Sequence, residues 1–123
     1  MKPKVFISQW MPQKGVELIK EYCEIDYHSD VNPLPKEQFI ERAKKADALV
    51  MFVTDEIDAE IVSKCPNLRI ISSFGKGYDN IDVKACSEKD ILVIINRESL
   101  TNSTADLAMG LLLSLCRNIL PGD

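Results

Sequence analysis

Ala48-Leu49-Val50-Met51-Phe52-Val53 is an unbroken apolar run near the middle of a 123-residue chain. A short run without polar alternation is typical of a strand that is covered on both faces, as strands of parallel sheets are. Parallel strands need a long connection between them, and that connection is usually a helix. The run therefore predicts an α/β fold, provided that helical patterns flank it on both sides.

Strand-like and helical patterns alternate outward from this run in both directions. Predicted strands cover residues 5–8, 25–28, 48–53, 68–74 and 91–96. Predicted helices cover residues 16–22, 36–46, 58–64, 82–89 and 103–119. Five β-α units of this size predict a flavodoxin-like parallel sheet of order 2-1-3-4-5 with helices on both faces, in one domain over residues 1–123.

Charge and cysteine usage restrict the classes of ligand that the chain can take. Fifteen basic and nineteen acidic residues give a net charge of −4, without a basic block. Nucleic acids and anionic membranes bind to concentrated positive charge, so neither is an expected partner. One histidine and four widely spaced cysteines do not form a metal-ligand pattern, so no metal is expected. Reduced cysteines and the absence of a signal peptide predict a cytoplasmic protein.

The last predicted helix carries no charge from Leu107 to Cys116. Ten residues are too few to cross a bilayer, so an all-round apolar helix predicts burial on every side. Leaving about four large apolar side chains in water would forgo roughly 6–12 kcal/mol. We expect one side of the helix to pack on the sheet, and either a homodimer through residues 103–119 or a missing domain to cover the other. Ser103 and Asp106 have the spacing of a capping box at the start of this helix.

The stretch SFGKGYDNID (residues 73–82) places Lys76 between Gly75 and Gly77, directly after a predicted strand. Open parallel sheets bind ligands at the carboxyl ends of their strands, so this loop lies on the ligand-binding edge. Glycines permit a positive φ and close approach of a ligand, and successive amides can form a nest for an anion. The Lys76 ammonium adds a positive charge. A small carboxylate or oxyanion is the expected ligand.

The spacing of this loop excludes two nucleotide-binding motifs and leaves a plain turn open. A Walker loop requires G-x-x-x-x-G-K-[ST], but Lys76 precedes the second glycine. A dinucleotide fingerprint requires a third glycine where Asn80 stands, and it follows the first strand of its unit. A plain strand-to-helix turn, with Asn80 or Asp82 capping the next helix, stays open and is compatible with ligand binding.

GKGYDNID (residues 75–82) and ILVIINRESLTNSTADLAMGLLLSLCR (residues 91–117) together resemble the D-2-hydroxyacid dehydrogenase family. The family pattern there is a G-x-G-x-D-N-[IV]-D loop, a strand ending in Asn, and a helix opening Thr-Ala-Glu-Leu-Ala, in which Asp106 replaces the Glu. The likeness extends over essentially the whole chain and corresponds to the N-terminal, substrate-binding part of these enzymes. A lysine between the loop glycines looks like the phosphonate (phosphite) dehydrogenase branch.

The resemblance implies a role for each matching position. It implies a small anionic substrate, which is a 2-hydroxyacid, a 2-oxoacid or phosphite. The positions that match substrate-binding residues are Val53, Thr54, Gly75, Lys76 and Gly77. Lys76 and Thr104 match positions close to the nicotinamide of NAD or NADP.

Parts of the family pattern are absent from this sequence. It has no G-x-G-x-x-G and none of the Arg, Glu and His set that performs hydride transfer, and His28, on a predicted edge strand, is not a substitute. We therefore expect the substrate-binding part of an NAD(P)-dependent oxidoreductase, truncated before its Rossmann domain, inactive alone and without tight cofactor binding. The alternative is a stand-alone dimeric anion-binding or interaction module. A receiver or flavin carrier is disfavoured because Ile7–Trp10 holds no acidic cluster.

Overall fold

The computed structural model of the protein describes residues 1–119, and its sheet has the predicted topology. The order is β2-β1-β3-β4-β5, and every neighbouring pair is parallel. The strands are β1 (Lys4–Ile7), β2 (Glu24–Tyr27), β3 (Ala48–Met51), β4 (Ile70–Ser73) and β5 (Leu92–Ile94). The helices are α1 (Gln13–Tyr22), α2 (Lys36–Ala43), α3 (Ala59–Lys64), α4 (Val83–Glu88) and α5 (Thr101–Cys116). The flavodoxin-like prediction is confirmed.

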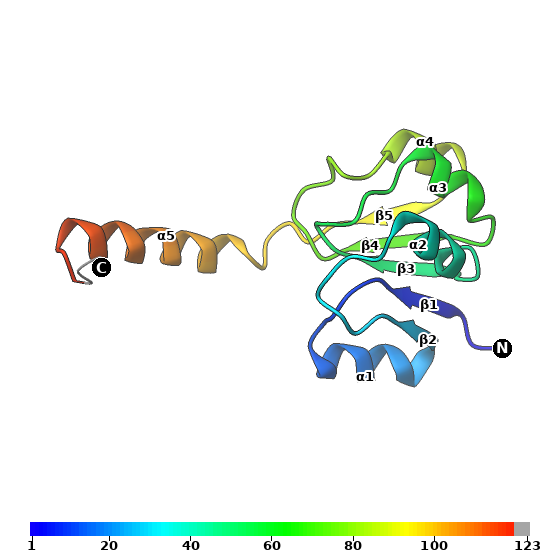
Figure 1. The fold of residues 1–123 in the computed structure, drawn as a ribbon, viewed down its shortest axis with the longest axis horizontal. Helices are drawn as coiled ribbons and strands as arrows, with labels where there is room; N and C mark the ends of the chain where they lie inside the picture. The colour runs from blue at the N-terminus through cyan, green and yellow to red at the C-terminus, as the bar shows by residue number, and fades with distance from the viewer. Residues whose placement is uncertain (120–123) are drawn as a thin grey trace.

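Helices cover both faces of the sheet, but unequally (Figure 1). α2, α3 and α4 lie on one face, where Leu49 and Met51 of β3 are fully buried in the larger core cluster. α1 covers the opposite face, where Ala48 and Val50 pack against the smaller cluster. The expected coverage of the central strand on both faces is therefore confirmed. The strand ends at Met51 rather than Val53, because Phe52 begins a turn.

The sheet face that α1 covers is open over β4 and β5. Ile70, Leu92 and Ile94 point to this face and are 38%, 57% and 46% exposed. Ile70 and Leu92 are register partners, so these side chains form one continuous apolar strip. The second core cluster thus extends over β1, β2 and β3 only.

Side chains at the carboxyl edge start two of the helices. Asp58 accepts a hydrogen bond from the Ile61 amide at 2.9 Å and caps α3. Asp82 accepts one from the Ala85 amide at 2.9 Å and caps α4. Each carboxylate satisfies an amide that the first helical turn leaves without a partner. Of the two caps that the sequence offered for α4, Asp82 is the one used.

The C-terminal helix differs from the sequence expectation in position and in start. α5 extends away from the sheet (Figure 1), and none of its residues is buried. The expected packing of one side on this sheet is therefore wrong for this structure. The expected capping box is also wrong, because the helix begins earlier, after Leu100, and the Ser103 hydroxyl donates to the Leu100 carbonyl at 3.2 Å. The rest of the expected range, residues 117–119, lies beyond the helix.

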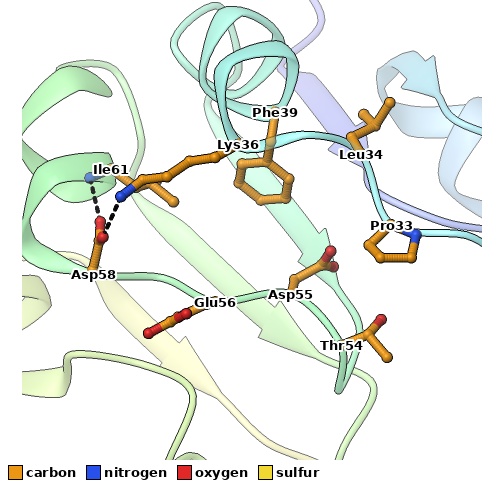
Figure 2. A pocket seen from close by; sticks show the side chains of 9 residues that line it. All are labelled: Pro33, Leu34, Lys36, Phe39, Thr54, Asp55, Glu56, Asp58 and Ile61. Atoms are coloured by element: carbon orange, nitrogen blue, oxygen red, sulfur yellow. Dashed lines mark hydrogen bonds and ion pairs between the residues drawn. The ribbon is translucent and has the colours of Figure 1, made fainter.

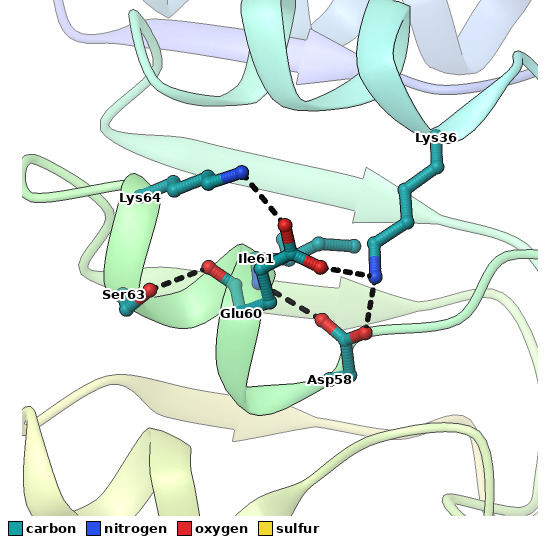
Figure 3. Close-up of polar contacts among 6 residues, drawn as sticks. All are labelled: Lys36, Asp58, Glu60, Ile61, Ser63 and Lys64. Atoms are coloured by element: carbon teal, nitrogen blue, oxygen red, sulfur yellow. Dashed lines mark hydrogen bonds and ion pairs between the residues drawn. The ribbon is translucent and has the colours of Figure 1, made fainter.

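An ion-pair network joins α2 to α3 (Figure 3). The Lys36 ammonium lies between the carboxylates of Asp58 and Glu60, 2.7 Å from the latter, and Lys64 contacts Glu60 at 2.7 Å. The hydrogen bonds to Asp58 and Glu60 raise the pKa of Lys36. The bond from Lys36 lowers the pKa of Asp58, and bonds from Lys36 and Lys64 lower the pKa of Glu60.

This network makes stability depend on pH in a defined direction. The folded pKa values of Asp58 and Glu60 lie below their ordinary values of 3.8 and 4.5, so their stabilisation is present above those values and is lost as pH falls through the folded pKa. Lys36 contributes fully below its ordinary pKa of 10.5 and loses its effect only as pH rises through its raised pKa. We expect Lys36→Gln to lower the melting temperature most between about pH 5 and about pH 9.

Thermal melts followed by circular dichroism across the acid range test this expectation. The difference between wild type and Lys36→Gln should shrink below about pH 4, because the carboxylates are then increasingly protonated in both proteins. Lys20→Gln is the matched control, since Lys20 is an exposed helix lysine that forms no ion pair within residues 1–119. A difference that stays constant down to strongly acidic pH would contradict the role given to Lys36.

Candidate functional site

Two loops meet at the carboxyl edge of the sheet. The turn at residues 52–55 follows β3, and the loop at residues 74–82 follows the neighbouring strand β4. The Asn80 side-chain amide donates to the carbonyl of Asp55 at 2.8 Å and to that of Val53 at 3.5 Å. The Ile57 amide donates to the Asn80 carbonyl at 2.8 Å, which closes the connection. The structure thus brings the segment of Val53 and Thr54 beside the glycine-lysine-glycine loop.

A side chain at position 75 would crowd Val53, whereas the backbone torsion at this position does not call for glycine. A Cβ atom at this position would lie 2.7 Å from Cγ1 of Val53, a distance that forces a shift. Neither Gly75 nor Gly77 has a positive φ, so the expected use of that torsion is wrong, and the αR–αL nest that depends on it is not formed. The Gly75 amide is occupied, since it donates to Oγ of Ser73 at 3.1 Å.

Lys76 presents positive charge and free donors at this edge. Its side chain is exposed, and its ammonium donates to Oγ1 of Thr101 at 3.2 Å. Among residues 1–119, no carboxylate pairs with this ammonium, and the amides of Lys76 and Gly77 have no acceptor. An anion placed here would gain a charge-assisted hydrogen bond and two backbone donors without displacing an existing ion pair.

Thr104 lies near the lysine loop, whereas His28 lies far from it across the sheet. Thr104 follows Thr101 by three residues on α5, so it lies on the helix face that Lys76 contacts. His28 follows β2, at the opposite edge of the sheet from β4 and β5, and its Nε2 lies 3.1 Å from the Asn32 carbonyl. The structure therefore brings Thr104 toward Lys76 and leaves His28 outside the candidate site.

A cavity of about 220 Å³ opens beside the turn at residues 52–55. Figure 2 shows Lys36 and Phe39 on the α2 side of this cavity and the segment from Thr54 to Asp58 along the other. Three carboxylates line it, those of Asp55, Glu56 and Asp58, and its one ammonium already pairs with Asp58. This charge balance disfavours an anion in the cavity.

Sequence reasoning missed a buried polar cluster behind this edge. Ser8, Gln9 and Asp55 are 0%, 6% and 5% exposed, and Asp55 bonds to the other two. The position of these residues in the sequence could have indicated the cluster. Ser8 and Gln9 follow the first apolar strand, Asp55 follows the third, and these two strands were predicted to be neighbours. The cluster binds Thr54 as well, since Nε2 of Gln9 donates to its Oγ1 at 2.6 Å.

The described residues give no sign of two other kinds of site. No group of three or more His, Cys, Asp or Glu side chains within residues 1–119 is placed to hold a metal ion. In the same range, no helix has the length and apolar character needed to cross a membrane. All four cysteines are free.

An open parallel α/β sheet whose loops meet at its carboxyl edge belongs to the class of domains that bind ligands at that edge. Within that class, residues 5–111 match the profile of the D-isomer specific 2-hydroxyacid dehydrogenase catalytic domain. The chain belongs to this family, and the resemblance seen in the sequence is confirmed at that level.

Relatives and solved structures agree with this assignment. Glyoxylate reductases of Pyrococcus furiosus and Korarchaeum cryptofilum are 39% and 42% identical over 123 residues. Each aligns with 100% of this chain and 37% of its own length. A crystal structure of a protein from Thermus thermophilus has a TM-score of 0.89 at 32% identity, over 94% of this chain and 37% of that one. A crystal structure of cofactor (NAD+) bound 3-phosphoglycerate dehydrogenase of Entamoeba histolytica has a TM-score of 0.81 at 27% identity. The match covers 100% of this chain and 42% of that one.

The contact between Gly75 and Val53 leads to a testable expectation. Gly75→Ala should destabilise the fold by about 1–3 kcal/mol, because the added methyl overlaps Cγ1 of Val53. Val53→Ala alone should change stability little, since Val53 is 70% exposed, and it should rescue Gly75→Ala when the two are combined. Urea unfolding followed by circular dichroism measures all three proteins.

Gly110→Ala is the matched control for this series. A Cβ at Gly110 meets nothing within 4 Å, so the substitution should not destabilise the chain, and it should raise helix content in α5. If the double variant were no more stable than Gly75→Ala, the clash with Val53 would not be the reason for glycine at this position.

Proposed function

We propose that this chain binds the acidic group of a small 2-oxo or 2-hydroxy acid at Lys76 and the amides beside it. The observation that carries the proposal is the exposed Lys76 ammonium, which has no ion-pair partner within residues 1–119. Val53 and Thr54, on the adjoining turn, form the neighbouring wall, and Gly75 lets this wall come close. Relatives named glyoxylate reductase support a carboxylate substrate, with glyoxylate as the first probe.

We also propose that residues 1–123 are the N-terminal, substrate-binding part of an NAD(P)-dependent oxidoreductase. The chain spans 37% of the length of the glyoxylate reductases that it matches, which supports this placement. In such an enzyme the nicotinamide supplies or accepts a hydride. Lys76 and Thr104 are proposed to lie near the nicotinamide because they match family positions close to it, and the Lys76 ammonium contacts α5 at Thr101.

We propose that this chain does not form a dinucleotide site by itself. The sequence has no G-x-G-x-x-G, and the amide of Gly75 is already occupied by Ser73. We therefore propose that the 123-residue chain is catalytically inactive alone and does not bind NAD or NADP tightly. Its own contribution is to neutralise and orient the substrate's acidic group. Four free cysteines agree with the reducing cytoplasm as its location.

Phosphite is a second candidate substrate. The observation in its favour is the lysine between the two loop glycines, which offers a full positive charge to an oxyanion. Phosphite and glyoxylate differ in shape and charge, so one titration series with both anions separates the two candidates.

Replacement of Lys76 tests the anion site directly. Lys76→Met should weaken glyoxylate binding about tenfold or more, because a charge-assisted hydrogen bond is lost while the length of the side chain is nearly kept. Isothermal titration calorimetry on the purified chain measures this change. Lys84→Met, at an exposed lysine of α4, should leave affinity unchanged. Undiminished binding of both glyoxylate and phosphite by Lys76→Met would remove Lys76 from the site.

We further propose that the chain forms a homodimer through residues 103–119. Leu107, Leu111 and Leu115 of this segment are 64%, 58% and 81% exposed, so a partner would remove a large apolar area from water. The same surface would suit a stand-alone dimeric anion-binding module, which is the alternative to an enzyme part.

Sedimentation velocity tests the dimer. Wild type should sediment as a dimer at micromolar concentration, and Leu111→Glu should shift it to a monomer, because a charge would be buried in an apolar interface. Leu18→Glu, at a leucine of α1 that is 60% exposed, is the control and should remain dimeric. A monomeric wild type would contradict the proposal.

A further inference from the structure

A groove of about 540 Å³ lies on the sheet face that α1 covers only in part. Its floor is a row of four apolar side chains, one from each of β1, β3, β4 and β5, and each is the register partner of the next. They are Val5, Ala48, Ile70 and Leu92. Exposure rises along the row, from 6% at Val5 to 57% at Leu92. The row is therefore buried beside α1 and open to water at β5.

The topology of the fold leaves this half of the face without a helix. The crossovers place α2, α3 and α4 on the other face, and β5 is the last strand within residues 1–119 (Figure 1). Parallel sheets normally bury both faces against helices. Ile94 lies two residues after Leu92 on β5, so it extends the same open surface toward the carboxyl edge. An apolar helix is the element that would complete this face.

The C-terminal helix α5 has the complementary property, since it is apolar and lacks a surface to pack on. None of its residues is buried, and the stretch from Leu107 to Cys116 carries no charge. Its 16 residues make a helix about 24 Å long, which exceeds the roughly 13 Å of a four-residue strand such as β4. One such helix can therefore cover the open surface along its whole length.

The helix of the same chain is held away from this groove. The Asn96 amide donates to the Gly75 carbonyl at 3.1 Å, and the Lys76 ammonium donates to Oγ1 of Thr101 at 3.2 Å. These bonds tie the connection between β5 and α5 to the carboxyl edge, and α5 runs outward from there (Figure 1). A helix from a second copy can reach the groove without breaking them.

Charges at the groove match the end of such a helix. Helices that cover a parallel sheet run antiparallel to its strands, so a docked α5 would bring Arg117, which follows it, to the amino edge. Asp47 and Asp90 line the groove at that edge, and neither carboxylate forms an ion pair within residues 1–119. Arg69 also lines it and would face the negative pole of the helix.

We propose that α5 of a second copy docks in this groove, over Ile70, Leu92 and Ile94, and that the exchange is mutual. Each copy then gives one helix and receives one, which makes a two-fold symmetric contact. This inference rests on the proposed homodimer. It identifies the surface that the helix binds as the sheet of the other copy rather than its helix.

Sedimentation velocity of a groove variant tests the proposal on the 123-residue chain. Leu92→Lys should shift the dimer to a monomer at micromolar concentration, because a charge would be buried beneath the docked helix. Leu92 is 57% exposed in the single chain, so the variant should keep the fold, which circular dichroism checks. Val31→Lys is the matched control and should remain dimeric, since Val31 is 68% exposed and lies outside the groove.

A mixing experiment distinguishes a helix-to-sheet exchange from a pair of helices. Leu111→Glu keeps an intact groove and Leu92→Lys keeps an intact helix, so an equimolar mixture of the two monomers should form a heterodimer through one complete contact. A mixture that stays monomeric would overturn the exchange. If Leu92→Lys dimerised like wild type while Leu111→Glu did not, this inference would fail and the proposed homodimer would stand. A monomeric wild type, as when α5 folds back on its own sheet, would overturn both.

Discussion

Parallel pairing of β3 between β1 and β4 is the constraint on which the rest of the structure depends. It buries Leu49 and Met51 completely and so sets the larger core. It also brings the carboxyl ends of three neighbouring strands to one edge, because parallel strands all point the same way. The segments that leave those ends lie close enough to bond to one another, and they do so through Asp55 and Asn80.

The two charged groups at the carboxyl edge, Asp55 and Lys76, differ in how deeply they are buried. The Asp55 carboxylate is held by neutral donors and is screened from the surface by the turn that it closes, while the Lys76 ammonium stands in solvent. In a chain of net charge −4, this leaves a local positive group where the backbone also offers free amides. The exposed Lys76 ammonium is thus accessible from solvent, whereas the buried Asp55 carboxylate holds the turn at residues 52–55.

The sequence predicted the sheet because apolar runs and helical periods are local signals. The strand order follows from them, as does the position of the lysine loop, whereas the choice of Asp82 over Asn80 as the cap of α4 came only from the structure. Tertiary contacts were beyond that reasoning. A side chain at position 75 would crowd Val53, on the loop of another strand, and the Thr54 hydroxyl bonds to Gln9. Such constraints depend on which loops meet, and periodicity does not report that.

The two halves of the chain differ in how completely they are covered. Strands β1 to β3 pack into the two core clusters, whereas the strip of Ile70, Leu92 and Ile94 and the whole of α5 keep apolar side chains in water. Apolar side chains stabilise a protein only when they leave water, so this strip and α5 suit contacts that residues 1–119 do not make among themselves. Lys76, through its bond to Thr101, stands where the covered half meets the uncovered one.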